Sequence, residues 1–252
     1  MPKKTPADIC PRPEALPTLS TVPQAPAIYP ASVWQCAGPD QALALLRGEE
    51  EGYVYQRDGH PNADLLAAKL RELHGCEQAA ITSSGMAAMA AVVLSQLEQR
   101  DHIVVSDQLY GRSLDLLAGQ WPRLAVACYA IATCDLYAVD SAGTAKTKLI
   151  VVETISNPLL RVADITALAE IAHQHNARLV VDNTFASPVV CRPLEWGADI
   201  VVESISKSIN GHSDVMLGAV CGSDDALKNV PLIMNVWGHS SSTIDCWLAA
   251  RG

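Results

Sequence analysis

The 252-residue chain has the composition of a globular protein, with 49% hydrophobic residues, 18% charged residues and a mean hydropathy of +0.15. Its formal net charge of −9 and pI near 5.2 argue against binding to nucleic acid or to anionic membrane lipids, because both need a basic surface. No apolar run reaches transmembrane length, and the N-terminus lacks the apolar segment of a secretory signal. The eight cysteines form no C-x-x-C pair, which excludes the common zinc spacings and favours reduced core thiols. We therefore expect a cytoplasmic protein that has no metal site and no nucleic-acid or membrane partner.

The first segment is rich in proline, with nine of the fifteen prolines among residues 1–39. This concentration of proline disfavours regular helix or sheet, and it predicts that residues 1–61 form an extended arm. Within the arm, "GPDQALALLRGEE" predicts a short helix with Asp40 as its N-terminal cap.

From residue 62 onward, short β-branched runs alternate with helical patterns, which predicts one large α/β domain over residues 62–252. The first predicted helix begins at a capping Asn62 and ends at Gly75. The further predicted helices cover residues 85–99, 111–121 and 164–176, and the predicted strands cover residues 78–82, 102–106, 124–130, 148–154, 177–183, 199–204 and 216–222. Because most strand runs are continuously apolar, we expect a mostly parallel sheet sandwiched by helices on both faces.

Polar residues follow several of these strands at the point where each strand ends. Parallel strands bring their carboxyl ends to one edge of a sheet, and ligands bind at that edge. We therefore expect four strand ends to converge on one site, carrying Ser83-Ser84-Gly85, Ser156-Asn157, Asp182, and Ser204, Ser206 and Lys207.

The chemistry of each candidate is ambiguous when it is taken alone. The amides of Gly85 and Met86, at the start of a helix, could hold a phosphate, although Ser-Ser-Gly is also a common helix cap. Asp182 could face a protonated ligand nitrogen or hydrogen-bond into the next turn. Lys207 could form a Schiff base or be an ordinary solvated lysine. A phosphate nest, a carboxylate and a lysine together fit pyridoxal 5′-phosphate (PLP).

The sequence resembles the Cys/Met-metabolism (trans-sulfuration) enzymes of the fold-type I, PLP-dependent class, which include cystathionine γ-synthase, cystathionine γ-lyase and methionine γ-lyase. The resemblance covers residues 22–252. It is carried by the segments "APAIYPASVW", "YVYQR", "TSSGMAAM", "DQLYGRS", "VETISNPLLRVADI", "VVDNTFASPVVCRPLEWGADIVVESISKSINGHSD" and "CWLAARG", in that order. The resemblance implies an α/β, fold-type I transferase fold and a PLP-dependent carbon–sulfur lyase or transferase acting on an amino acid.

The resemblance also implies roles for individual residues. Lys207 would bind PLP covalently and shuttle protons, Asp182 would keep the ring nitrogen protonated, and Tyr110 would stack on the ring. The remaining cofactor contacts would come from Asn157 to the phenolic oxygen and from Gly85, Met86, Ser204 and Ser206 to the phosphate. Tyr55 and Arg57 would reach the cofactor phosphate of a neighbouring subunit, so the resemblance implies a homodimer or homotetramer. The expected catalytic residues are Lys207, Tyr110, Asp182 and Tyr55.

The chain also departs from the family pattern. Ser206 replaces a usual threonine, and Ser208 replaces a usual aromatic residue. Family members continue past the Trp-Leu-x-x-Arg-Gly motif into a C-terminal small domain that supplies the arginine for the substrate carboxylate, whereas this sequence stops at Gly252. Two hypotheses follow: a trans-sulfuration enzyme, or a catalytically inactive PLP-binding remnant. For the enzyme, a cystathionine γ-synthase or γ-lyase reaction is the first choice, and methionine γ-lyase, cystathionine β-lyase and O-acetylhomoserine sulfhydrylase are the alternatives.

Overall fold

A seven-stranded sheet forms the centre of the protein. The computed structural model describes residues 20–21 and 23–252, so the predicted arm before residue 20 lies outside the described residues. The strands are β1 (Gln78–Thr82), β2 (His102–Ser106), β3 (Ala127–Ile131), β4 (Thr147–Glu153), β5 (Arg178–Asp182), β6 (Ile200–Glu203) and β7 (Gly218–Gly222). Their order across the sheet is β1-β7-β6-β5-β4-β2-β3.

The sheet is mostly parallel, as the sequence predicts. The pairs β2–β3, β2–β4, β4–β5 and β5–β6 are parallel, whereas β7 runs antiparallel to both β1 and β6. Because two antiparallel pairings separate β1 from β6, these two strands point in the same direction. The carboxyl ends of β1, β6, β5, β4 and β2 therefore share one edge of the sheet, where ligand sites of α/β proteins lie.

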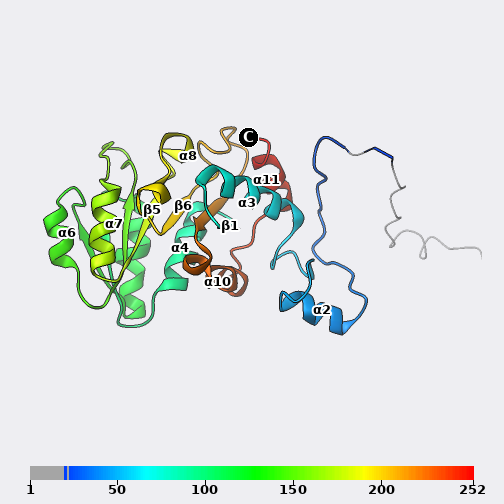
Figure 1. Ribbon diagram of the computed structural model, residues 1–252, viewed down its shortest axis with the longest axis horizontal. Coiled ribbons are helices and arrows are strands. Elements are labelled where there is room, and N and C mark those ends of the chain that lie inside the picture. Colours follow the sequence, from blue (N-terminus) through cyan, green and yellow to red (C-terminus); the bar gives the residue numbers. More distant parts are fainter. Residues whose placement is uncertain (1–19, 22) are drawn as a thin grey trace, which may run out of the picture.

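Helices cover both faces of the sheet (Figure 1). One face packs against α4 (Gly85–Gln96), η1 (Asp115–Gln120), α9 (Asp224–Leu227) and α10 (Val230–Trp237). The opposite face packs against α3 (Pro61–His74), α6 (Leu136–Ala142), α7 (Ile165–Gln174) and α11 (Thr243–Ala249). The other short helices are α2 (Pro39–Leu46), α5 (Gly111–Leu114), η2 (Trp121–Leu124), α8 (Ser187–Val190) and η3 (Pro193–Trp196).

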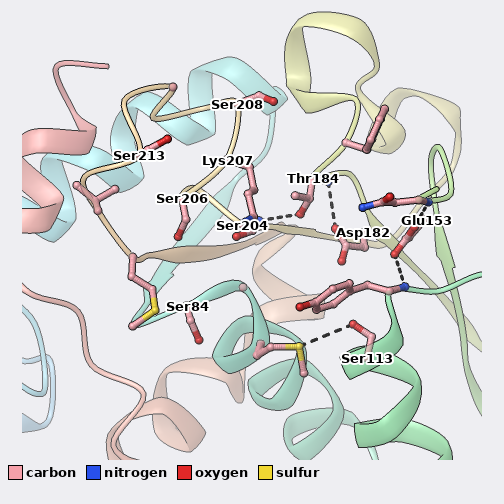
Figure 2. Close-up of a pocket in the computed structure, with 18 residues that line it drawn as sticks. Ser84, Ser113, Glu153, Asp182, Thr184, Ser204, Ser206, Lys207, Ser208 and Ser213 are labelled. Atoms are coloured by element: carbon pink, nitrogen blue, oxygen red, sulfur yellow. Dashed lines mark hydrogen bonds between the residues drawn. The ribbon is translucent and has the colours of Figure 1, made fainter. Parts of the chain in front are cut away.

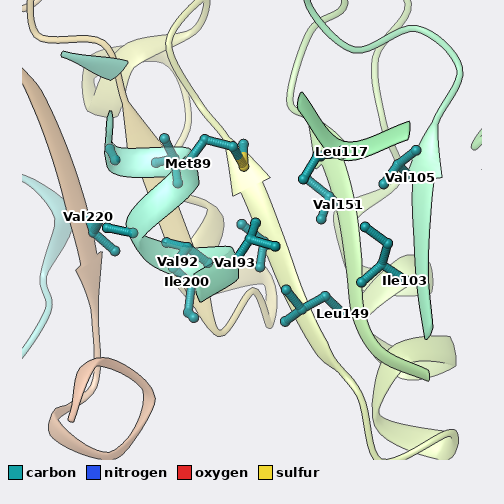
Figure 3. Packing of buried hydrophobic residues seen from close by; sticks show 14 of the residues in the cluster. Met89, Val92, Val93, Ile103, Val105, Leu117, Leu149, Val151, Ile200 and Val220 are labelled. Carbon is teal, nitrogen blue, oxygen red and sulfur yellow. The ribbon is translucent and has the colours of Figure 1, made fainter. Parts of the chain in front are cut away.

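The central strands are buried on both faces, which explains their continuously apolar sequences. Every residue of β2, β6 and β7 is buried, and Met89, Val92 and Val93 of α4 pack against apolar side chains of the sheet (Figure 3). This burial holds α4 against the sheet and thereby fixes the position of its first residue, Gly85, at the carboxyl edge.

Two predicted elements differ from the structure between residues 111 and 131. The predicted helix 111–121 consists of α5, a π-helical turn and a 3₁₀ turn in succession, because Pro122 lacks the N–H that a continuous helix needs. The predicted strand 124–130 begins at Ala127 instead, because Leu124 ends the 3₁₀ turn and Ala125 has a positive φ of 62°.

Both predicted N-terminal caps were wrong, whereas the predicted C-terminal glycine is confirmed. Gly38 caps α2 without any side-chain hydrogen bond, and Asp40 lies within the first turn. His60 caps α3, and Asn62 instead ties this helix to the preceding segment by accepting from Tyr29 N at 3.0 Å. Gly75 ends α3 with a φ of 64°, a conformation that glycine adopts readily.

Residues 23–60 form a segment that precedes the domain and includes α2. This helix lies apart from the sheet and its covering helices and has no buried residue (Figure 1). Few contacts tie this segment to the domain, among them the hydrogen bond from Trp247 Nε1 to Pro26 O at 2.8 Å. In the described part of the chain, no helix combines the length and apolar character that a membrane crossing requires. The same residues contain no group of three or more His, Cys, Asp and Glu side chains suited to a metal ion.

Candidate functional site

A cavity of about 1080 Å³ opens at the carboxyl edge of the sheet. Eight of the residues predicted for the site line it together, namely Gly85, Met86, Tyr110, Asn157, Asp182, Ser204, Ser206 and Lys207. The labelled side chains in Figure 2 show Lys207, Ser204 and Ser206 near Asp182 and Glu153. The convergence of strand ends that the sequence predicts is therefore present in the structure.

The segments predicted to hold a phosphate meet at the start of α4. Ser84 caps this helix, and its Oγ accepts from Ala87 N at 3.1 Å. Since the first amides of a helix have no partner within it, Gly85 and Met86 keep their N–H groups available to an anion. Ser84 therefore caps the helix, while Gly85 and Met86 line the cavity, and phosphate binding by their amides stays a prediction.

Glycines allow these backbones to approach closely. A Cβ on Gly85 would lie 2.8 Å from Ser204 Cβ, and a Cβ on Gly218 would lie 2.2 Å from the carbonyl oxygen of Ser84. The close approach brings the loop after β1 and the loop after β6 together at the cavity.

Gly218→Ala is expected to disrupt this part of the site, because its methyl group would overlap the Ser84–Gly85 peptide. We expect a loss of about 1–3 kcal/mol in the free energy of unfolding, together with weaker binding of inorganic phosphate. Urea denaturation and a phosphate titration monitored by calorimetry measure the two effects. The matched control is Gly119→Ala, whose Cβ meets no atom within 4 Å, and equal effects of the two substitutions would contradict the steric explanation.

Asp182 ends β5 and faces the cavity. Its Oδ1 accepts from Thr184 N at 3.0 Å, and Thr184 Oγ1 in turn accepts from Ser204 N at 2.8 Å. Burial raises the pKa of Asp182, and none of the ion pairs among the described residues includes this carboxylate. Asp182 therefore hydrogen-bonds into the next turn and also presents a carboxylate suited to a protonated ligand nitrogen.

Lys207 lies in the turn after β6, and its side chain is exposed to the cavity. Two backbone hydrogen bonds fix the turn, from Lys207 N to Ser204 O at 3.0 Å and from Gly211 N to Lys207 O at 2.8 Å. The amine is thus held on a fixed backbone and is open to an aldehyde, which is the geometry that a Schiff base requires.

Sequence reasoning missed Glu153 and Thr184, which also line the cavity. Glu153 is the last residue of an apolar strand, "KLIVVE", and a carboxylate in that position is the same signal that identified Asp182 in "LVVD". Thr184 gives no comparable signal, because its role depends on the approach of Ser204 from a different strand.

Tyr55 and Arg57 do not line this cavity. The Arg57 guanidinium lies 5.6 Å from the centre of the Tyr55 ring, and its Nη1 donates to Asn235 O at 3.0 Å. The structure therefore leaves these two predicted site residues on the surface of their own chain, next to α10.

The sequence profile of the Cys/Met metabolism PLP-dependent enzymes matches residues 16–252. The chain belongs to this family. The family cofactor, PLP, is the one that the strand-end residues indicate, and those residues fit it: free amides for a phosphate, a buried carboxylate for the ring nitrogen and an accessible lysine for the aldehyde.

Individual relatives agree with this assignment. L-methionine gamma-lyase from Porphyromonas gingivalis is 39% identical over 228 residues, which cover 89% of this chain and 57% of that enzyme. Cystathionine gamma-synthase from Mycobacterium bovis is 40% identical over 208 residues, which cover 82% of this chain and 53% of that enzyme. The chain spans about half the length of the curated relatives it matches.

A solved structure confirms the predicted fold class. The crystal structure of metB from Corynebacterium glutamicum matches with a TM-score of 0.84 and 34% sequence identity, over 90% of this chain and 57% of that chain. The α/β fold-type I architecture, with a mostly parallel sheet between helices, is therefore established for this family member.

Proposed function

We propose that the protein is a PLP-dependent trans-sulfuration enzyme, a carbon–sulfur lyase or transferase. It acts on sulfur amino acids or activated homoserine by β- or γ-elimination or by γ-replacement. The observation that supports this proposal best is the single cavity in which Lys207, Asp182 and the free amides of Gly85 and Met86 meet. Relatives named methionine gamma-lyase, cystathionine gamma-synthase and cystathionine beta-lyase support the same chemistry.

The position of each side chain in the cavity indicates its role. PLP, when bound, withdraws electrons from the substrate carbon next to the amine. Lys207 would hold the cofactor covalently, and its Nζ would be the group that moves a proton from that carbon. Asp182 keeps the ring nitrogen protonated, and Thr184 orients the Asp182 carboxylate through its backbone N–H. Ser204 and Ser206 orient the phosphate from the loop that carries Lys207.

A cystathionine γ-synthase or γ-lyase type of reaction is our first choice. Methionine γ-lyase, cystathionine β-lyase and O-acetylhomoserine sulfhydrylase activities are the alternatives. These reactions release different products, because γ-elimination yields 2-oxobutanoate and β-elimination yields pyruvate, whereas γ-replacement forms a new thioether or thiol amino acid.

With PLP added, we expect turnover of cystathionine or O-succinylhomoserine, since the residues that hold the cofactor are assembled in one cavity. The assay measures 2-oxobutanoate, pyruvate and cystathionine separately, with cysteine as the nucleophile for replacement and free PLP without protein as the control. If no product forms from these substrates, nor from methionine or O-acetylhomoserine, although PLP is bound to Lys207, the enzyme proposal fails and a catalytically inactive PLP-binding protein is the better description.

We further propose that the chain assembles as a homodimer or homotetramer in which residues 1–61 form a contact arm and residues 62–252 form the cofactor domain. Tyr55 and Arg57 would then reach the site of the neighbouring subunit. Two features support this. Both residues lie outside the cavity of their own chain. The arm and α10 also carry exposed apolar side chains, including Val33, Tyr55 and Val236.

Mixing two inactive variants tests the shared site. Arg57→Ala and Lys207→Ala should each be inactive alone, because one removes a phosphate contact and the other removes the covalent anchor. After equal amounts are mixed under conditions that let subunits exchange, we expect about a quarter of the wild-type activity. About half of the dimers are then mixed, and half of the sites in a mixed dimer are intact. A mixture as inactive as its components would contradict the shared site.

We also propose a cytoplasmic location. The cysteines in the described part of the chain are free thiols, as expected in a reducing compartment. Localisation of a tagged copy by cell fractionation would test this.

A further inference from the structure

Glu153 lies in the cavity at the end of β4, beside Asp182. The two residues face each other in the register of β4 and β5, so two carboxylates occupy adjacent positions at the carboxyl edge. Figure 2 shows the labelled Glu153 and Asp182 side chains next to each other. The roles described above use Asp182 and leave Glu153 without a function.

The Glu153 carboxylate joins two loops that belong to different strands. Its Oε1 accepts from Tyr110 N at 2.5 Å, and its Oε2 accepts from Asn157 N at 3.3 Å. Tyr110 follows β2 and caps α5, whereas Asn157 follows β4. Each residue also lines the cavity, so one carboxylate sets the relative positions of two residues that face the ligand.

Glu153 also lines a second, small cavity. It has a volume of about 20 Å³, and its lining includes Glu153, Ser106, Thr133 and Ser156. The buried Ser106 and Thr133 hydroxyls hydrogen-bond to each other at 3.0 Å. A polar space of this size has room for about one water molecule. Glu153 thus lines both cavities.

Glu153 is mostly ionised under mildly basic conditions, and an ionised carboxylate is suited to accept two N–H bonds. Burial, followed by the charge of Asp182, raises the pKa of Glu153 to about 7, while the bonds from Tyr110 and Asn157 oppose this shift. At pH 8 the carboxylate is mostly ionised and accepts both bonds as an anion, in which state such bonds are strongest.

We propose that Glu153 is a positioning residue that holds Tyr110 and Asn157 at the separation that a planar ring needs between them. The inference rests on the proposed PLP site and deepens it. Glu153 acts through the two backbone N–H groups and does not itself touch the reacting atoms. The loop after β2 and the loop after β4 are then held together by Glu153, so a ligand in the cavity shifts them together.

Glu153→Gln tests this role at pH 8. The amide oxygen of glutamine accepts one N–H, but its NH₂ group cannot accept the other, so the two loops lose their common anchor. We expect the apparent dissociation constant of PLP to rise about 10- to 100-fold, as for the loss of one hydrogen bond to a charged group. The circular dichroism of the bound chromophore, which reports the orientation of its ring, should change as well.

Asp115→Asn is the matched control, because it neutralises an exposed carboxylate on the segment that follows Tyr110, outside the cavity. It should leave both readouts unchanged. Glu153→Ala gives an independent arm: added acetate can occupy the vacated space and accept both N–H groups, so it should restore affinity in part, whereas acetamide should not. If Glu153→Gln is unfolded, Glu153→Asp replaces it. This variant should bind PLP at least about tenfold more weakly than the wild type, because its shorter side chain does not reach both N–H groups.

An unchanged PLP affinity and chromophore dichroism in the folded variant would overturn the proposal, and so would a lower unfolding midpoint with unchanged affinity. This failure differs from failure of the proposed function. In the latter case the wild-type protein itself forms no reducible PLP adduct on Lys207, or forms the adduct without any turnover, whereas failure of the present inference concerns only the PLP affinity and dichroism of the Glu153 variants.

Discussion

Lys207→Ala is expected to abolish covalent PLP binding. The wild-type protein should turn yellow with PLP, and borohydride reduction should leave the cofactor attached to Lys207, because this amine is exposed to the cavity on a fixed turn. Alanine removes the only atom of this residue that can form the bond. Turnover should fall by at least about 10²- to 10⁴-fold from the lost proton transfer alone.

Visible absorbance and mass spectrometry of the reduced, digested protein measure the adduct. Lys228→Ala is the control, since Lys228 is an exposed lysine at the end of α9, outside the cavity. Far-UV circular dichroism establishes that both variants are folded. A reducible adduct that persists in Lys207→Ala, or a wild-type protein that stays colourless, would show that the lysine is assigned wrongly.

The second large effect is expected at a buried pair beneath the site, His74 and Glu203. His74 Nε2 lies 3.4 Å from Glu203 Oε1, and both side chains are at most 1% exposed. Glu203 Oε1 also accepts from Asn183 Nδ2 at 2.9 Å, so the pair is linked to the residue that follows Asp182. Burial raises the pKa of Glu203 to about 8 and lowers the pKa of His74 to about 4.

Glu203→Leu should lower the free energy of unfolding by about 1–3 kcal/mol, because it leaves the buried, uncharged His74 ring without its polar neighbour. His74→Leu combined with Glu203→Leu should be as stable as the wild type or more so, since an apolar pair needs no hydrogen-bond partners and Asn183 keeps its bond to Cys191 O at 3.0 Å. Urea denaturation of all variants at pH 6 measures these differences. Equal losses in the single and double variants would mean that the pair is not coupled.

The same pair predicts a pH dependence. The folded pair holds one proton between about pH 4 and pH 8, whereas the unfolded chain holds one between 4.5 and 6.5. Above pH 6.5 the unfolded chain has released its proton and the folded protein has not, so stability falls as the pH rises. The expected loss by pH 8 is about 2 kcal/mol, and the double variant should lack it. A wild type that becomes more stable between pH 6.5 and 8 relative to the double variant would contradict this.

The sequence by itself determined the type of fold and most of the strands. Strands β1 and β2 match their predicted bounds, because each is a short β-branched or apolar run flanked by residues that disfavour strand. It also predicted the main residues that line the cavity, since a polar residue after an apolar strand is a local signal, and Asp182 and Lys207 both carry it. The family resemblance added the cofactor, and the comparisons confirm that assignment.

Only the tertiary structure decided how these residues are held. The predicted cap Asn62 proved to bond Tyr29, 33 residues away in the chain, and the bridging role of Thr184 depends on Ser204 of another strand. Glu153 carried the same local signal as Asp182, yet its bond to Tyr110 exists only because β2 and β4 are neighbours in the sheet. Local sequence encodes which side chains end a strand. Which backbone groups those side chains meet depends on strand order, and strand order is set by packing between residues far apart in the chain.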